Sequence, residues 1–295
     1  MKLKSLLLTT VFSFSLTPFA VAESAKDLFY QGVKADRQGN VIHAAKLYEQ
    51  ACNGGEIVGC HNLGNAYSNG IGVKQDYSQA VKFYEKACNG GVSESCHNLG
   101  NAYFNGIGVK QDYSQAVKFY EKACNSGAVK GCDNLGHLYS KGQGVKQNHA
   151  KAAQLYEKSC NGGEVVACHN LGISYDKGQG VKQNHARAAQ FFDKACNGGY
   201  AAGCSNLALL YYSGKGVEQS HAKTIQLFDK ACNGGFAGGC YNLGFLYDSS
   251  QGDLQNKSTA KKYYSKACDL GYTQGCDMQK KTQSIKHAIN FFQAD

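Results

Sequence analysis

The sequence has one proline, no tryptophan and two methionines, and Asp, Glu, Lys and Arg make up only 18% of its 295 residues. With 43% hydrophobic residues, the chain has too much apolar material for a disordered polar tail. The scarcity of proline beside 36 glycines excludes collagen and proline-rich linkers. The net charge of +9 is spread along the chain without a basic cluster, so no nucleic-acid partner is expected.

The first 22 residues have the pattern of an export signal. Lys2 and Lys4 precede an apolar stretch over 6–19, and Ala20 and Ala22 are the small residues that signal peptidase requires. We predict a signal peptide over 1–22 and a secreted or periplasmic mature protein. No later segment is long and apolar enough to span a membrane, so no membrane span is expected after cleavage.

The fourteen cysteines follow a strict pattern: the two members of a pair are eight residues apart, and successive pairs begin 36 residues apart. An even cysteine number in an exported chain indicates disulfides. Zinc is the alternative, but zinc sites need four ligands together, usually two to four residues apart. We predict pairing within each Cys-x7-Cys, around its short glycine-rich turn. The predicted disulfide cysteines are Cys52, Cys60, Cys88, Cys96, Cys124, Cys132, Cys160, Cys168, Cys196, Cys204, Cys232, Cys240, Cys268 and Cys276.

The 36-residue period indicates a solenoid of helical repeats. Leu63, Gly64 and Tyr67 have helical spacing, and a second helix is expected after a capping residue such as Asp76. The fold is therefore predicted to be all-α, a right-handed α/α superhelix. The expected units are a short repeat over 23–55, six repeats over 56–91, 92–127, 128–163, 164–199, 200–235 and 236–271, and a C-terminal capping helix over 272–295.

The motif Cys-x2-Leu-Gly-x2-Tyr, followed by Gly-x-Gly-Val and Ala-x3-Tyr-x2-Ala-Cys, resembles Sel-1-like repeats, which are relatives of the tetratricopeptide repeat. The Cys-x7-Cys pairs resemble the Helicobacter cysteine-rich protein family. This resemblance implies disulfide-pinned α/α repeats in an exported protein, and binding or weak hydrolysis of β-lactams, with a β-lactam or cell-wall fragment as ligand. Ala208, which replaces the helix glycine, and the altered loop at 249–254 depart from the motif.

No catalytic motif accompanies the resemblance. Ser-x-x-Lys, the nucleophile element of serine β-lactamases, lacks its Ser-Asp-Asn and Lys-Thr-Gly partners, so no catalytic residue is assigned. The histidines recur one per repeat, too far apart to share a metal, and are interpreted as surface residues copied by duplication. No metal or cofactor is expected. The three Ser-x-x-Lys matches are Ser174/Lys177, Ser220/Lys223 and Ser258/Lys261.

One asparagine recurs in six repeats, directly before the leucine that occupies the same position in each repeat. If the first helices line the concave surface, these amides form a row suited to the backbone of an extended peptide. The alternative is that each amide bonds within its own turn or to the neighbouring repeat. We predict a monomeric scaffold that holds a peptide or protein in its concave groove, with β-lactam hydrolysis as the alternative function. The candidate groove residues are Asn62, Asn98, Asn134, Asn170, Asn206 and Asn242.

Overall fold

The structure, a computed structural model, describes residues 23–249 and 255–281, which are helical with short connections and contain no strand. The all-α prediction is confirmed. Each of the fourteen delimited helices has 13 residues. They are α1 (Ala25–Arg37), α2 (Val41–Asn53), α3 (Ile57–Asn69), α4 (Tyr77–Asn89), α5 (Ser93–Asn105), α6 (Tyr113–Asn125), α7 (Val129–Lys141), α8 (His149–Asn161), α9 (Val165–Lys177), α10 (His185–Asn197), α11 (Ala201–Ser213), α12 (His221–Asn233), α13 (Ala237–Ser249) and α14 (Lys257–Asp269).

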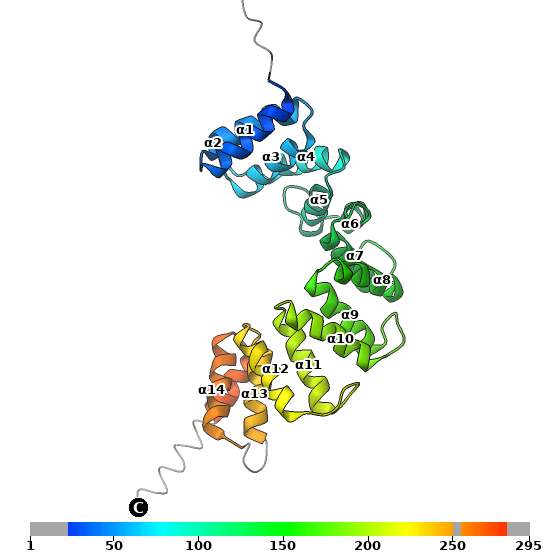
Figure 1. The fold of residues 1–295 in the computed structure, drawn as a ribbon, viewed down its shortest axis with the longest axis vertical. Helices are drawn as coiled ribbons and strands as arrows, with labels where there is room; N and C mark the ends of the chain where they lie inside the picture. Colours follow the sequence, from blue (N-terminus) through cyan, green and yellow to red (C-terminus); the bar gives the residue numbers. More distant parts are fainter. Residues whose placement is uncertain (1–22, 250–254, 282–295) are drawn as a thin grey trace, which may run out of the picture.

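The helices form antiparallel pairs that stack into an arc. Each helix packs mainly against its neighbours in the chain, as expected for a solenoid in which every repeat contacts only the next. Figure 1 shows α1 and α2 at one end of the arc, α14 at the other and α8 on the outer side, with α5 and α7 toward the inside. We call the odd-numbered helices from α3 to α13 the first helices, and each following helix the second helix of its repeat.

The helix ends follow the sequence signals. Asp76 and Asn148 cap α4 and α8, since their Oδ1 atoms accept hydrogen bonds from the third helical residue's N–H at 3.0 and 2.9 Å. Asn40 has the cap position of α2 but makes no side-chain cap bond. The first helix α3 ends at Gly70, whose φ of 69° lies in the left-handed region that favours glycine.

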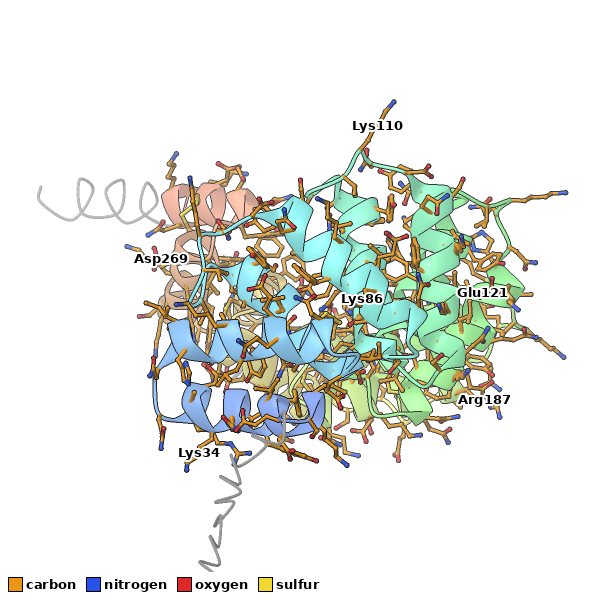
Figure 2. The ribbon with its side chains drawn as sticks, turned by 90° about the horizontal axis from the view of Figure 1, so that it is seen from above. Lys34, Lys86, Lys110, Glu121, Arg187 and Asp269 are labelled. Atoms are coloured by element: carbon orange, nitrogen blue, oxygen red, sulfur yellow. A yellow bond between two sulfur atoms is a disulfide. The ribbon has the colours of Figure 1, made fainter. Side chains whose placement is uncertain are left out.

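The core is a column of one leucine from each first helix and one aromatic ring from each second helix. Leu135 and Tyr120 are almost completely buried. The rings pack directly on the helix glycines: a Cβ atom on Gly136 would lie 2.8 Å from Cε1 of Tyr156. The close approach of a neighbouring helix, which the sequence predicts from these glycines, is therefore present. Polar side chains such as Lys34 and Lys110 point outward (Figure 2).

All seven predicted disulfides are present, each within its own Cys-x7-Cys pair, so the predicted pairing is confirmed. Each bridge joins the end of an even-numbered helix to the first turn of the helix that follows it; Cys88 of α4, for example, is bonded to Cys96 of α5. In two repeats, a lysine two residues before the first cysteine of the pair adds a second link to the preceding repeat. Lys86 donates to the Cys52 carbonyl of the preceding repeat at 2.8 Å.

Two predicted segments lie partly or wholly outside the described residues. The predicted signal peptide, 1–22, is one of them. Of the predicted capping helix, residues 273–281 are helical and 282–295 lie outside the described part. Among the helices that the structure describes, none is long and apolar enough to cross a membrane.

Candidate functional site

The recurring asparagines lie half-buried on the first helices, and most of them link neighbouring repeats. Asn134 Nδ2 bonds to His97 Nε2 at 3.1 Å and to Asn101 Oδ1 at 3.2 Å. Asn170 Nδ2 donates to Asp133 Oδ1 at 3.1 Å. Asn98 and Asn206 contact the preceding repeat in the same way. The alternative considered for the sequence, bonding to the neighbouring repeat, therefore holds for four of the six amides, namely Asn98, Asn134, Asn170 and Asn206.

The histidines that follow the second cysteine are part of the same inter-repeat contacts. His61 Nδ1 lies 2.7 Å from Ser95 Oγ, and His169 Nε2 lies 2.9 Å from Asn206 Nδ2. The interpretation of this set as surface residues is wrong, since His169 is only 9% exposed. Its Nδ1 is buried without a hydrogen-bond partner, because Gly203 stands where Ser95 stands for His61.

A hollow lined by asparagines lies between α3, α4 and α5. It has a volume of about 320 Å³, and its polar lining comes mainly from five asparagines of the two first helices. The buried residues Val81, Tyr84 and Ala102 form its floor, and the Tyr84 hydroxyl donates to Asn65 Oδ1 at 2.8 Å. We call the five asparagines the amide groove: Asn65, Asn69, Asn98, Asn101 and Asn105.

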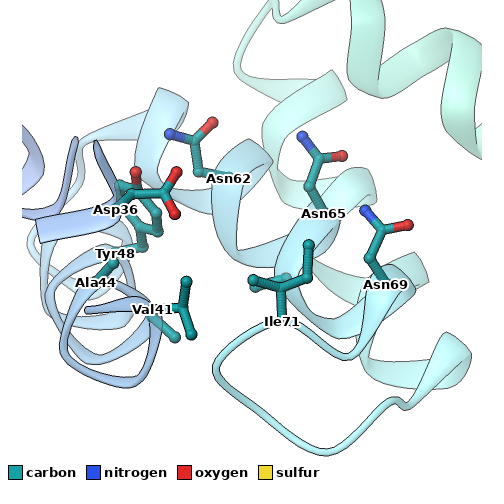
Figure 3. A pocket seen from close by; sticks show the side chains of 10 residues that line it. Asp36, Val41, Ala44, Tyr48, Asn62, Asn65, Asn69 and Ile71 are labelled. Carbon is teal, nitrogen blue, oxygen red and sulfur yellow. The ribbon is translucent and has the colours of Figure 1, made fainter. Parts of the chain in front are cut away.

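A smaller pocket of about 160 Å³ continues the amide groove toward the N-terminal end. Figure 3 shows Asn62, Asn65 and Asn69 along α3, with Asp36 and Tyr48 beside Asn62. Asn65 and Asn69 line both pockets. The amide-lined surface therefore runs continuously across the first three helix pairs.

The sequence reasoning missed Asn69 and Asn105, which end α3 and α5. Both are exposed, and the Asn69 side chain makes no hydrogen bond within the described part of the chain. Asn105 donates only to the Asn101 carbonyl, at 3.0 Å. The available signal was the spacing of three asparagines at i, i+3 and i+7, which places them on one helix face. That triplet occurs in both nearly identical copies.

The Ser-x-x-Lys serines have structural roles. Ser174 is buried and donates to the Asn170 carbonyl at 3.0 Å. Ser220 caps α12 by accepting from the Lys223 N–H at 3.3 Å. Ser258 lies exposed in the first turn of α14. Within residues 23–249 and 255–281, no three His, Cys, Asp or Glu side chains are grouped so that they could hold a metal ion.

Burial shifts the pKa values of the histidines and the aspartate that lie between repeats. Desolvation lowers the pKa of His61, His97 and His169, although Glu94 partly offsets this at His61. Desolvation also raises the pKa of Asp133 to about 6; the Asn170 hydrogen bond opposes this shift, and the charge of Glu164 adds to it. Around His97 the charged groups are Lys130, Glu164 and Glu94. These shifts predict that the contacts between repeats respond to mildly acidic pH.

We expect His61, His97 and His169 to destabilise the fold as the pH falls. Because their folded pKa values are lowered, their stabilisation is complete above about pH 6.5 and is lost below it. Asp133 opposes this: with a raised pKa of about 6, its contribution is present at low pH and lost as the pH rises. The melting temperature should fall between about pH 7.5 and about pH 5.5. Thermal unfolding followed by circular dichroism at each pH measures the melting temperature.

The matched variants separate these histidines from other acid effects. Changing His61, His97 and His169 together to Gln should reduce the loss of melting temperature, whereas His43→Gln, at an exposed site on α2, should leave it unchanged. An equal loss in the wild type and the triple variant would contradict the prediction.

The geometry defines a class: a solenoid of α/α pairs whose repeats are joined by disulfides and amide contacts. The family model for the Sel1 repeat matches residues 57–92, 93–127, 129–164, 165–200, 201–236 and 237–272. The chain belongs to the Sel1 repeat family. Residues 44–54 also match the aromatic-di-alanine repeat. No curated protein sequence matches the chain.

Solved structures share the fold. A Sel1 repeat protein from Oxalobacter formigenes has a TM-score of 0.73 at 24% identity, covering 82% of this chain and 96% of that one. A protective antigen from uropathogenic Escherichia coli has a TM-score of 0.68 at 30% identity over 86% of this chain, which spans only 63% of the antigen's length. Helicobacter pylori cysteine rich protein B is 32% identical over 46% of this chain and 97% of its own, with a TM-score of 0.38. The family model therefore confirms the resemblance to Sel1 repeat proteins.

Proposed function

We propose that this protein is a scaffold outside the cytoplasm that binds an extended peptide, or a peptide segment of a protein, in its amide groove. The observation that carries the proposal is the continuous amide-lined surface, with Asn69 and Asn105 exposed along it. Seven disulfides support an oxidising compartment, as does the predicted signal peptide.

An extended peptide fits the chemistry of this surface. Its backbone offers one N–H and one C=O per residue, and the exposed amides of Asn69 and Asn105 can donate and accept. The apolar floor formed by Val81 and Ala102 can take one side chain between the amides. Because the groove repeats similar contacts, affinity would come from several modest hydrogen bonds, each worth about 0.5–1.5 kcal/mol net.

The expected result for Asn69→Ala combined with Asn105→Ala is weaker peptide binding with an almost unchanged melting temperature. Neither amide links two repeats, so two hydrogen bonds to the ligand are lost without loss of packing. We expect a three- to tenfold weaker affinity, which corresponds to about 1 kcal/mol. Fluorescence anisotropy with a peptide selected from a random dodecapeptide library measures it.

Asn134→Ala is the matched comparison. Its amide links α7 to α5, so this change should lower the melting temperature even where affinity changes little. If the recurring asparagines only faced a ligand, Asn134→Ala would leave the melting temperature unchanged. Unchanged affinity in the Asn69/Asn105 variant would count against the groove.

Slow β-lactam hydrolysis is the second candidate and rests on the family resemblance alone. Its test is turnover of a chromogenic cephalosporin by the purified protein, with a heat-denatured sample as control. Turnover that disappears on denaturation would favour it. No cysteine in residues 23–249 and 255–281 has a free thiol, so this candidate does not include a cysteine nucleophile.

A further inference from the structure

Among the six first helices, the residue after the second cysteine changes along the stack, and only α7 has an acid there. The position holds His61, His97, Asp133, His169, Ser205 and Tyr241 in turn. These side chains project from the first helices toward the next repeat, where His61 contacts Ser95 and His169 contacts Asn206. Asp133 therefore places a carboxylate in the middle of the first helices, which otherwise have no acid at this position. The one other acid that follows a cysteine pair, Asp277, lies beyond them.

Asp133 has no cationic partner. The ion pairs in the described part of the chain are His185–Asp176 and Lys257–Asp248, and the hydrogen bond to Asp133 is the one from Asn170 Nδ2 to Oδ1. Its second oxygen is not among the buried polar atoms that lack a partner, so Oδ2 reaches solvent. Lys130, one turn earlier on α7, makes no ion pair with it. The carboxylate thus has one free, accessible oxygen.

The surroundings of Asp133 favour an incoming positive charge. The residue is half-buried, so its carboxylate has lost much of its hydration. Glu164, at the start of α9, adds a second negative charge to the field at this carboxylate. A cation that reached Oδ2 would restore the lost solvation with a charge-assisted hydrogen bond, the stronger kind of hydrogen bond in proteins.

The same repeat marks a change at a second position of the first helices, the one that Asn65 occupies in α3. The register position of Asn65 holds Asn65, Asn101, His137, Ile173, Leu209 and Phe245 in turn. Leu209 and Phe245 are 45% and 47% exposed, which is unusual for large apolar side chains aligned on one face. The surface is therefore amide-lined before Asp133 and apolar after it.

We propose that Asp133 binds a cationic group of the peptide ligand, and that the apolar side chains of that peptide cover Ile173, Leu209 and Phe245. The inference rests on the proposed function, since it names the class of peptide that the groove selects. The cation is a Lys or Arg side chain or a free amino terminus, because both supply N–H donors with a positive charge. Charge complementarity at Asp133 and continuity with the amide groove support this occupant.

The experiment uses labelled dodecapeptides that share an Asn/Ser/Gly segment and a leucine-rich segment and differ at the residue between them. That residue is Lys in one peptide and norleucine in the other, both N-acetylated; a third peptide begins with a free amino terminus at the same point. Anisotropy titrations of the full chain should give about tenfold tighter binding for a cationic peptide. Preference for the Lys peptide or for the free amino terminus identifies the source of the cation.

Asp133→Asn is the deciding variant because it keeps an acceptor for Asn170 and removes the charge. It should abolish the preference for the cationic peptide without weakening the norleucine peptide. Its melting temperature at neutral pH should be equal or higher, since a desolvated charge is removed; a merely structural Asp133 would give a lower one. Asp193→Asn, on an exposed acid of α10, is the control and should keep the preference.

Two results would overturn the inference, and they distinguish failure of the cation site from failure of the proposed function. Equal binding of all peptides to the wild type and to Asp133→Asn, with weaker binding in the Asn69/Asn105 variant, rejects the cation site and leaves the groove intact. Absence of binding by every peptide to the folded protein rejects the proposed function and this inference with it.

Discussion

Reduction of all seven disulfides is expected to unfold the protein at room temperature. Each bridge closes a loop between cysteines eight residues apart. Closing a loop of that size stabilises the folded state by roughly 2–3 kcal/mol in the chain-entropy model. The combined contribution of seven bridges exceeds the total stability of most domains, about 5–15 kcal/mol. Far-UV circular dichroism before and after treatment with a phosphine reductant measures the loss of helix.

The position of the bridges adds to this expectation. Every disulfide crosses the junction between two repeats, so reduction weakens the contacts on which a solenoid depends. Replacing Cys160 and Cys168 by Ala should cost about 2–3 kcal/mol and lower the melting temperature, with the other six bridges intact. Retention of full helicity and an unchanged melting temperature in the reduced protein would contradict the prediction.

Much of the fold follows from local signals in the sequence. The cysteine spacing predicted the disulfide pairing, because a Cys-x7-Cys pair brackets one turn between two helices. Asp76 and Asn148 marked helix starts because a cap bond involves only residues two or three positions away. Such signals repeat in every unit, so the sequence alone was enough to predict them.

The role of the asparagines was less accessible from sequence because it depends on how repeats stack. Asn134 contacts His97 and Asn101, which are 37 and 33 residues away. Helical periodicity places Asn134 on one face of α7 but does not say which residue of the preceding repeat it contacts. The same reason explains the histidines. The His169 ring packs against Phe192 of α10 and against Tyr200, the residue before α11. Contacts between repeats required the structure.

Gly144→Ala is expected to be among the most damaging single substitutions in the chain. Gly144 has a φ of 70°, where an L-residue is strained by about 1–2 kcal/mol. Its Cβ atom would also overlap the backbone carbonyl of Tyr113 at the start of α6 in the preceding repeat. The neighbour is backbone and cannot move aside as a side chain can. We expect a loss of about 3 kcal/mol or more, measured by chemical denaturation.

Two matched glycines separate the causes of this loss. Gly163→Ala has a φ of 94° but open space around its Cβ atom, so it should show the backbone strain alone. Gly136→Ala has helical φ, and its Cβ atom would meet the Tyr156 ring at 2.8 Å. Ala208 already occupies the equivalent position opposite Phe228, so the ring can shift and the gain in helix propensity offsets part of the cost.

The expected order of destabilisation is therefore Gly144→Ala, then Gly163→Ala, then Gly136→Ala, with the last within about 1 kcal/mol of the wild type. The order follows from where the added methyl group lies: against fixed backbone, in open space with strain, or against a movable ring. Equal losses at Gly144 and Gly163 would mean that the loop of one repeat does not pack on the second helix of the preceding one. A larger loss at Gly136 than at Gly144 would mean that the contact between the two helices of a repeat is tighter than the contact between repeats.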